Sequence, residues 1–371
     1  MEFNIPSFFP LASPNIQDLD IDAAIKVLKS GNLVQGMEVE QFELAIAKYI
    51  GVKHAICVSN GTATLHLSLL ALGIGPGDEV IVPAFSYIAT ANVVELVGAT
   101  PIFVDIDINT FNINVNKIER KITTKTKAII PVHEFGLSCN ISEIVKIADK
   151  HNLFIIEDAA CALGATHFTQ KVGSFGKLGS FSFHPRKAIT SGEGGIITTN
   201  DDDLAAKLKS LRNHGINYVD GKMDFVLAGF NYRMTDFQAA LVNSQLNRID
   251  KIITIKNKLA EVYFNEINNP IITLPTVPKN YYHTWQTFHV LLDESLKQDI
   301  VIKILNERGI GTNYGAQCMP YQTFYKNKYK LNCELETPNA LNVFKKGLAI
   351  PIYEKLTEMD IKFIAQEINK L

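Results

Sequence analysis

Residues 78–107, DEVIVPAFSYIATANVVELVGATPIFVDID, contain the pattern that predicts the fold. An apolar run predicts a strand, a polar turn leads into a helical segment, and a second apolar run predicts another strand. The same order of strand, turn and helix precedes it in residues 54–73, HAICVSNGTATLHLSLLALG. Such alternation is typical of a mainly parallel sheet with helices on both faces.

Two further apolar runs end in polar residues. These runs are KAIIPVHEFG at residues 127–136 and LFIIEDAACALGA at residues 153–165. Ligands of open parallel sheets bind beyond the carboxyl ends of the strands, so these polar ends are the expected place for a site.

The two ends of the chain differ from this pattern. Residues 15–51 have helical apolar spacing in two pieces, separated by Gly31 and Gly36, and residues 237–267 have one long helical pattern. A proline-rich stretch and a mixture of strand-like and helical runs follow. The sequence therefore predicts a large α/β domain over residues 1–250 and a smaller α+β domain over residues 251–371.

Composition excludes several classes of protein. The 371 residues are 47% hydrophobic and 20% charged, and 36 Lys and Arg against 38 Asp and Glu give a net charge of −2. Neither nucleic acid nor a membrane is an expected partner, and we expect a cytoplasmic protein. The cysteines form no CxxC pair, so no metal site is expected. They are Cys57, Cys139, Cys161, Cys318 and Cys333.

The stretch SNGTAT, which begins at Ser59, lies between a predicted strand and a predicted helix. Gly61 permits close approach of the backbone, and free amides of Thr62 and Ala63 at a helix start would bind an anion such as phosphate. The alternative is an ordinary helix N-cap by Ser59, Asn60 or Thr62.

Two acids follow an apolar strand in FIIEDAA, Glu157 and Asp158. A buried acid is costly unless it is paired, and a protonated ring nitrogen or an arginine would pair it. The alternatives are a helix N-cap or a structural ion pair.

Residues 180–195, SFSFHPRKAITSGEGG, place Lys187 in a turn after a predicted strand. Enclosed there, the amine would lose solvation and act as a nucleophile. Read alone, the pattern favours a solvated surface lysine.

A polar loop, GFNYRMTD at residues 229–236, leads into a helix. Asn231 and Arg233 could reach an anion, or Arg233 could anchor the loop by pairing with Asp236. The loop alone does not decide between these two interpretations.

Together, the anion-binding turn, the acid, the lysine and the second basic loop are the parts of a pyridoxal phosphate site. The chain resembles the DegT/DnrJ/EryC1/StrS family of pyridoxal-phosphate sugar aminotransferases, which have fold type I. The resemblance includes SGNLVQGMEVEQFE at residues 30–43, GIGPGDEVIVPAFSYIATANVV at residues 73–94, PVHEFG at residues 131–136 and GLAIPIY at residues 347–353.

The resemblance implies roles for single residues. Lys187 would form the internal aldimine with pyridoxal 5'-phosphate, and Asp158 would hold the pyridine nitrogen protonated. The phosphate would be bound by Gly61, Thr62, Ala63 and Ser182. Tyr87 would stack on the cofactor ring, unless it is a core aromatic residue. Asn231 and Arg233 would reach the phosphate of the neighbouring subunit, which implies a homodimer with shared active sites.

Three departures from the family pattern are visible. Cys161 stands where many relatives have a glutamine or histidine near the ring hydroxyl of the cofactor, and a thiol is a poorer hydrogen-bond partner. Residues 131–136 read PVHEFG where relatives commonly have PVHLYG, and residues 314–325, YGAQCMPYQTFY, lack a common histidine-containing segment. These regions usually face the sugar.

The implied reaction is amino transfer from L-glutamate to a nucleotide-linked 4-keto-6-deoxyhexose in two half-reactions with ping-pong kinetics. In relatives that act at C3 the loop commonly reads like GxNSRLD and an N-terminal FLDL is frequent. This chain has GFNYRMTD and FFPLASP instead, so the resemblance favours amination at C4, with amination at C3 as the alternative. The expected setting is the synthesis of amino sugars for O-antigen, lipopolysaccharide or other surface polysaccharides. A dehydratase of the family would have histidine in place of Lys187, a non-catalytic relative would lack the full residue set, and a dinucleotide-binding enzyme would need a GxGxxG that is absent here. The roles of His184 and Arg186 remain unassigned.

Overall fold

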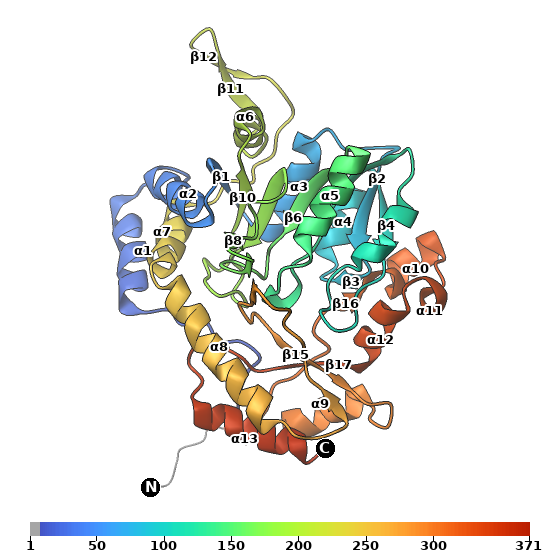
Figure 1. The fold of residues 1–371 in the computed structure, drawn as a ribbon. Coiled ribbons are helices and arrows are strands. Elements are labelled where there is room, and N and C mark those ends of the chain that lie inside the picture. The colour runs from blue at the N-terminus through green and yellow to red at the C-terminus, as the bar shows by residue number, and fades with distance from the viewer. Residues whose placement is uncertain (1–7) are drawn as a thin grey trace.

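The computed structural model describes residues 8–371, and its centre is a seven-stranded sheet (Figure 1). The strand order is β1-β10-β9-β6-β5-β2-β4. The pairs from β9 to β4 are parallel, and β10 pairs with both β9 and β1 in the antiparallel direction. The strands are β1 (His54–Val58), β2 (Glu79–Pro83), β4 (Thr100–Val104), β5 (Thr126–Ile129), β6 (Phe154–Asp158), β9 (Leu178–Ser182) and β10 (Gly195–Thr199).

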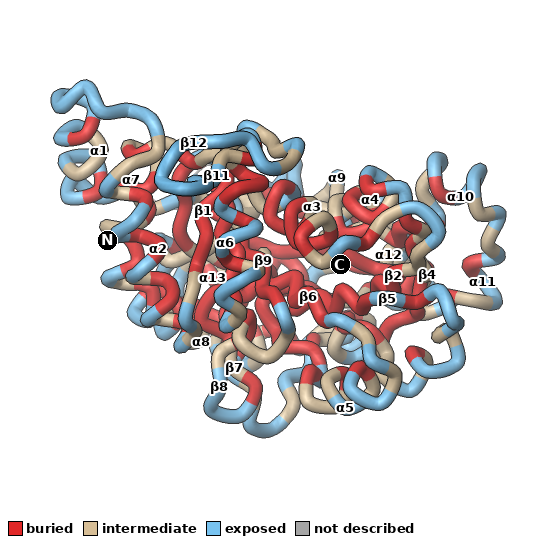
Figure 2. Tube along the Cα trace, turned by 90° about the horizontal axis from the view of Figure 1, so that it is seen from above, coloured by how far each residue is buried: buried red, intermediate tan, exposed pale blue. Residues whose placement is uncertain are grey.

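Helices cover both faces of this sheet because its central strands are apolar on both sides. Val80 and Val82 of β2 pack into the cluster formed with α3 (Gly61–Ala71) and α4 (Ala89–Leu96), whereas Ile81 packs toward α5 (Ile141–His151). The strands of the sheet are largely buried between these helices (Figure 2). The predicted mainly parallel α/β sheet is confirmed.

The N-terminal helices pack on one edge of this layer. Helices α1 (Asp18–Ser30) and α2 (Met37–Ile50) contact α7 (Asp236–Leu246). Gly31 ends α1 in the left-handed conformation, with φ of 77°, and Gly36 precedes α2. The two predicted helical pieces are therefore confirmed.

The long helical pattern of residues 237–267 is two helices, α7 and α8 (Ile249–Glu266), rather than one. The break falls at Asn247 and Arg248, a place with no glycine or proline to mark it. The guanidinium of Arg248 binds Asp20 of α1 through two hydrogen bonds of 2.8 and 2.6 Å, a contact between distant parts of the chain.

The C-terminal part contains a three-stranded antiparallel sheet in the order β13-β15-β17. Its strands are β13 (Ile272–Thr273), β15 (Phe288–Leu292) and β17 (Gly347–Ile350), and its helices are α9 (Gln298–Glu307) and α13 (Glu358–Asn369). Helices α10 (Thr323–Tyr329), α11 (Cys333–Glu336) and α12 (Pro338–Lys346) contribute instead to the apolar cluster of the large sheet. The domain division at residue 250 stays a prediction.

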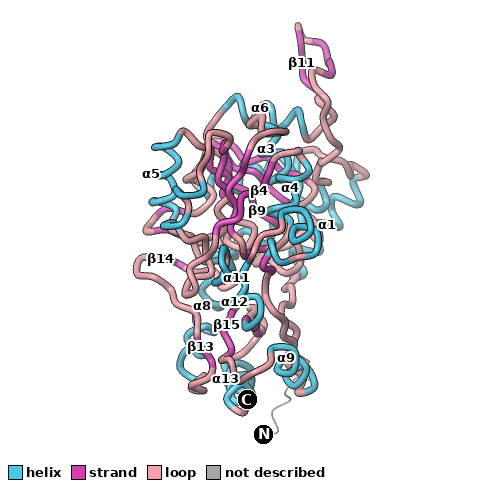
Figure 3. The backbone as a smooth tube through the Cα atoms, turned by 90° about the vertical axis from the view of Figure 1, so that its right-hand side faces the viewer, coloured by secondary structure: helices cyan, strands magenta, loops and turns pink. Residues whose placement is uncertain are grey.

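Three small sheets complete the fold of residues 8–371. β3 (Phe85–Ser86) pairs with β16 (Gln317–Cys318), and β7 (Thr166–His167) pairs with β8 (Gln170–Lys171) and β14 (Tyr281–Tyr282). The hairpin of β11 (Ile216–Val219) and β12 (Lys222–Phe225) follows α6 (Asp202–Leu211) and projects from the body of the molecule (Figures 1 and 3). Within residues 8–371, no helix has the length and apolar character needed to cross a membrane.

Candidate active site

A cavity of about 660 Å³ lies beyond the carboxyl ends of β6 and β9. This volume is in the range of small-molecule sites. The predicted residues that line it are Gly61, Thr62, Ala63, Tyr87, Asp158, Cys161, Ser182 and Lys187. The fold thus brings together four separate sequence stretches at the edge of the sheet where a ligand was expected.

Lys187 lies in the turn after β9 and is half-buried. Its Nζ donates a hydrogen bond to Sγ of Cys161 over 3.1 Å. The amine therefore faces the cavity, and the alternative of a freely solvated surface lysine is wrong.

Asp158 ends β6, is buried and faces the same cavity. Its Oδ2 accepts a hydrogen bond from Oγ1 of Thr90 at 2.9 Å, and its Oδ1 accepts one from the amide of Ala160 at 3.2 Å. Burial raises the pKa of Asp158, and the bonds from Thr90 and Ala160 oppose that rise. Both donors are neutral, so the carboxylate can still receive a cationic partner from the cavity.

Glu157, one residue earlier, points to the opposite side of the strand. Its carboxylate accepts backbone amide bonds from Gly173, Phe175 and Gly176 at 2.7 to 2.8 Å and lies 3.0 Å from Nε2 of His133. The structural alternative considered for this pair of acids therefore applies to Glu157, and Asp158 is the acid available to a ligand.

The turn at the start of α3 has fewer free backbone amides than the sequence suggested. Asn60 is the N-cap, and its side chain accepts the amide of Ala63 at 2.8 Å. The expectation of a free amide on Ala63 is wrong, because that N–H is already used. A Cβ on Gly61 would lie 2.8 Å from Cβ and 3.1 Å from Oγ of Ser182, so the close approach predicted for Gly61 is observed.

Tyr87 follows β3 and is 66% exposed while lining the cavity. An exposed aromatic side chain at a cavity rim is available to a flat ligand. The alternative of a buried core residue is wrong.

Asn231 and Arg233 do not line the cavity of their own chain. Asn231 is exposed, and Nη1 of Arg233 donates to Oδ1 of Asn213. Asp236 accepts the amides of Gly36 and Val39 at 2.7 and 3.1 Å. The proposed pairing of Arg233 with Asp236 is wrong, because that carboxylate caps the start of α2.

The cavity also contains residues that received no role from the sequence. His184 and Arg186 line it, as do Gly315 and Ala316 from the variable C-terminal stretch. Thr90, which binds Asp158, lies in the first turn of α4, three residues after Tyr87. This spacing could have indicated that Thr90 also faces the cavity.

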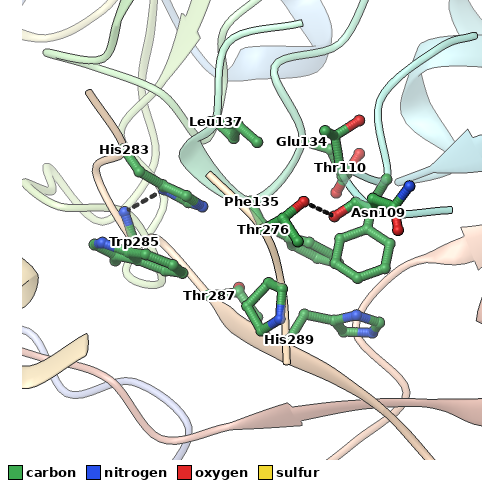
Figure 4. A pocket seen from close by; sticks show the side chains of 12 residues that line it. Asn109, Thr110, Glu134, Phe135, Leu137, Thr276, His283, Trp285, Thr287 and His289 are labelled. Carbon is green, nitrogen blue, oxygen red and sulfur yellow. Dashed lines mark hydrogen bonds between the residues drawn. The ribbon is translucent and has the colours of Figure 1, made fainter. Parts of the chain in front are cut away.

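Glu134 is the most informative of the cavity residues to which the sequence assigned no role. It lies on the cavity wall and on a smaller neighbouring pocket (Figure 4). The signal that found Asp158, a polar residue after a buried strand, was present in KAIIPVHEFG too. Residues 8–371 contain no group of three His, Cys, Asp or Glu side chains suited to a metal ion.

Comparison with known proteins agrees with this geometry. A model of the DegT/DnrJ/EryC1/StrS aminotransferase family matches residues 14–369. The GDP-perosamine synthase of Caulobacter vibrioides is 43% identical over 340 residues, which are 91% of this chain and 90% of that protein.

Two solved structures have the same fold over nearly their full length. Spr1654 from Streptococcus pneumoniae in its PLP form has a TM-score of 0.92 at 28% identity and covers 98% of both chains. Helicobacter pylori PseC, an aminotransferase involved in the biosynthesis of pseudoaminic acid, gives the same TM-score, identity and coverage. The predicted fold type I is confirmed, and the chain belongs to the DegT/DnrJ/EryC1/StrS aminotransferase family.

Proposed function

We propose that this chain, which by its family is a pyridoxal 5'-phosphate-dependent sugar aminotransferase, converts a nucleotide-linked 4-keto-6-deoxyhexose into the 4-amino sugar with L-glutamate as donor. The observation that carries the proposal is the presence of Lys187 and Asp158 on the wall of one cavity in a member of an aminotransferase family.

The residues of the cavity fit pyridoxal phosphate. Asp158 offers a buried carboxylate, held by two neutral donors, to a cationic ring nitrogen. Because Gly61 has no side chain, the backbone of this turn approaches Ser182 closely, and Thr62 and Ser182 would hold the phosphate there. Tyr87 would cover one face of the ring.

When bound, the cofactor supplies an aldehyde that exchanges with amines and a ring that withdraws electrons from the reacting carbon. Lys187 would hold the cofactor, and its amine, when free, would accept the proton of the α-carbon of L-glutamate. In the second half-reaction the same amine carries the proton in the opposite direction, toward the sugar. Asp158 would keep the ring nitrogen protonated in both halves.

Two observations support a nucleotide-sugar substrate. The family relative with 43% identity is named for synthesis of a GDP-linked sugar, and the cavity is wide enough for a cofactor and a sugar together. The choice of C4 over C3 is supported by GFNYRMTD at residues 229–236 and FFPLASP at residues 8–14.

A shared site in a homodimer is also part of the proposal. Asn231 is exposed outside its own cavity, so a partner's cavity is the place where it could contact a phosphate. The hairpin nearby exposes apolar side chains, as expected for a surface that another chain covers. They are Tyr218, Val219, Met223 and Phe225.

The experiment is a panel of nucleotide-linked 4-keto and 3-keto sugars incubated with the reconstituted protein and L-glutamate. Product mass and NMR identify the carbon that receives the amine, and a Lys187→Ala variant is the matched control. Amination of a 4-keto sugar is expected. Amination confined to 3-keto sugars contradicts the assignment of the carbon, and absence of amination with every sugar contradicts the enzyme assignment.

A further inference from the structure

Glu134 is a buried acid that the proposed reaction does not use. It is 4% exposed, it follows β5, and it shares the cavity wall with Asp158 and Lys187. Its Oε2 has no hydrogen-bond partner within residues 8–371. A buried polar atom without a partner costs free energy, so a ligand that supplies the partner is the simplest explanation.

The backbone holds Glu134 in this place. Its amide donates to Oδ1 of Asn112 at 2.8 Å, and the next two residues, Phe135 and Gly136, have φ of 55° and 100°. A Cβ on Gly136 would lie 3.2 Å from the carbonyl oxygen of Cys161. The turn that carries Glu134 is therefore packed directly against Cys161.

The charges around Glu134 favour its neutral form. Burial raises the pKa of Glu134 to about 8 and the charge of Asp158 adds to the rise, whereas the charge of Lys187 and hydrogen bonds from Ser86 and from the amide of Phe135 oppose it. On the other side lie His283 and His289 (Figure 4), whose pKa values burial lowers to about 3 and about 4. Neither histidine brings a positive charge at neutral pH, and a pKa of about 8 leaves Glu134 mostly protonated there, so it has a proton to donate.

The chemistry of pyridoxal phosphate supplies an acceptor for that proton. The ring carbon that bears the aldehyde, which reacts with Lys187, is next to the ring carbon that bears a hydroxyl. A group beside the lysine can therefore reach that hydroxyl. Cys161, 3.1 Å from Nζ of Lys187, is beside the lysine but has only a thiol, a weak hydrogen-bond partner.

We propose that Glu134 donates a hydrogen bond to the ring hydroxyl oxygen of the bound cofactor, the contact for which the thiol of Cys161 is poorly suited. The cofactor rather than the sugar is the partner because Glu134 is buried, whereas the exposed Tyr87 and Arg186 mark the open side of the cavity. This inference rests on the proposed use of pyridoxal phosphate.

Glu134→Leu and Glu134→Gln test the inference, with Glu143→Gln on the outer surface of α5 as the control. The readouts are the dissociation constant of pyridoxal phosphate and the pH midpoint of the visible absorption of the reconstituted protein. A bond donated to the ring oxygen stabilises its anionic form, so the proton shared with the lysine nitrogen is lost at lower pH.

Loss of this bond in Glu134→Leu should weaken cofactor binding about tenfold and raise the pH midpoint by about one unit. Glu134→Gln keeps an N–H donor and should remain close to the wild type, as should Glu143→Gln. Equal values for Glu134→Leu and the wild type would overturn the inference, and so would a Gln variant that behaves like the Leu variant.

Infrared difference spectra of the wild type provide a test that does not depend on how Glu134→Leu folds. Adding cofactor should shift a carboxylic acid C=O band that is missing in Glu134→Gln, and absence of that band in the wild type overturns the inference. The two proposals fail in different ways. A wild type that binds no pyridoxal phosphate refutes the proposed function, whereas normal binding with unchanged Glu134 variants refutes only the role of Glu134.

Discussion

Replacing Thr90 by valine should change the pH range in which the protein binds its cofactor. Thr90 is buried, and its hydroxyl donates to Oδ2 of Asp158 at 2.9 Å. Valine preserves the volume but removes the donor. A hydrogen bond to a charged group contributes about 1.5–3 kcal/mol, and one pKa unit corresponds to about 1.4 kcal/mol, so the pKa of Asp158 should rise by about 1–2 units.

The sign of the effect follows from the charge of Asp158. The ionised carboxylate attracts the protonated ring nitrogen, so affinity is highest above the pKa of Asp158 and falls as the pH drops through it. Because burial already raises this pKa, Thr90→Val should move the midpoint further upward. Cofactor affinity at a fixed pH just above the wild-type midpoint should therefore be lower in the variant.

Equilibrium dialysis with pyridoxal phosphate from pH 4.5 to 8 measures this midpoint. Thr199→Val is the matched control, since Thr199 is also buried. Its hydroxyl donates to the carbonyl oxygen of Lys177 at 2.9 Å and accepts the amide of Asp201 at 3.1 Å, and none of these residues lines the cavity. The control should bind cofactor like the wild type at every pH. Superimposable pH profiles for Thr90→Val and the wild type would refute the reasoning.

Two further predictions concern the phosphate turn and the shared site. Gly61→Ala should weaken cofactor binding at least about tenfold, because the added Cβ would lie 2.8 Å from Cβ of Ser182. If this clash is the cause, the double variant Gly61→Ala, Ser182→Gly should bind the cofactor no more weakly than Ser182→Gly alone. Simple additivity of the two effects in this double-mutant cycle contradicts the steric explanation. Mixing inactive Lys187→Ala and Asn231→Ala subunits after reversible dissociation should restore up to about one quarter of wild-type activity, because half of the randomly formed dimers contain one intact site. No recovery despite proven subunit exchange contradicts the placement of Asn231 in the partner's site.

Patterns with a local physical cause were predicted well. Alternating strands and helices follow from apolar runs separated by polar turns, and residues at strand ends gather at one edge because parallel strands share a direction. Lys187 and Asp158 reached one cavity for this reason, although 28 residues lie between them in the sequence.

Features that depend on distant partners were not predictable. The break between α7 and α8 lies beside Arg248, which binds Asp20, and no sequence pattern near position 248 indicates that contact. The use of Asp236 as the cap of α2, some 200 residues earlier, likewise displaced its expected bond with Arg233. The amide of Ala63 is a different case, because its partner Asn60 is local and was one of the N-cap residues that the sequence offered as the alternative to an anion; a cap residue and an anion compete for the same N–H groups.

The central claim is that Lys187 holds the cofactor through its amine, and borohydride reduction tests it most directly. Purified protein supplied with pyridoxal phosphate should be yellow, and reduction followed by peptide mass spectrometry should find the pyridoxyl group on Lys187. Reduction of the wild type that leaves Lys187 unmodified after cofactor has been supplied would contradict the account.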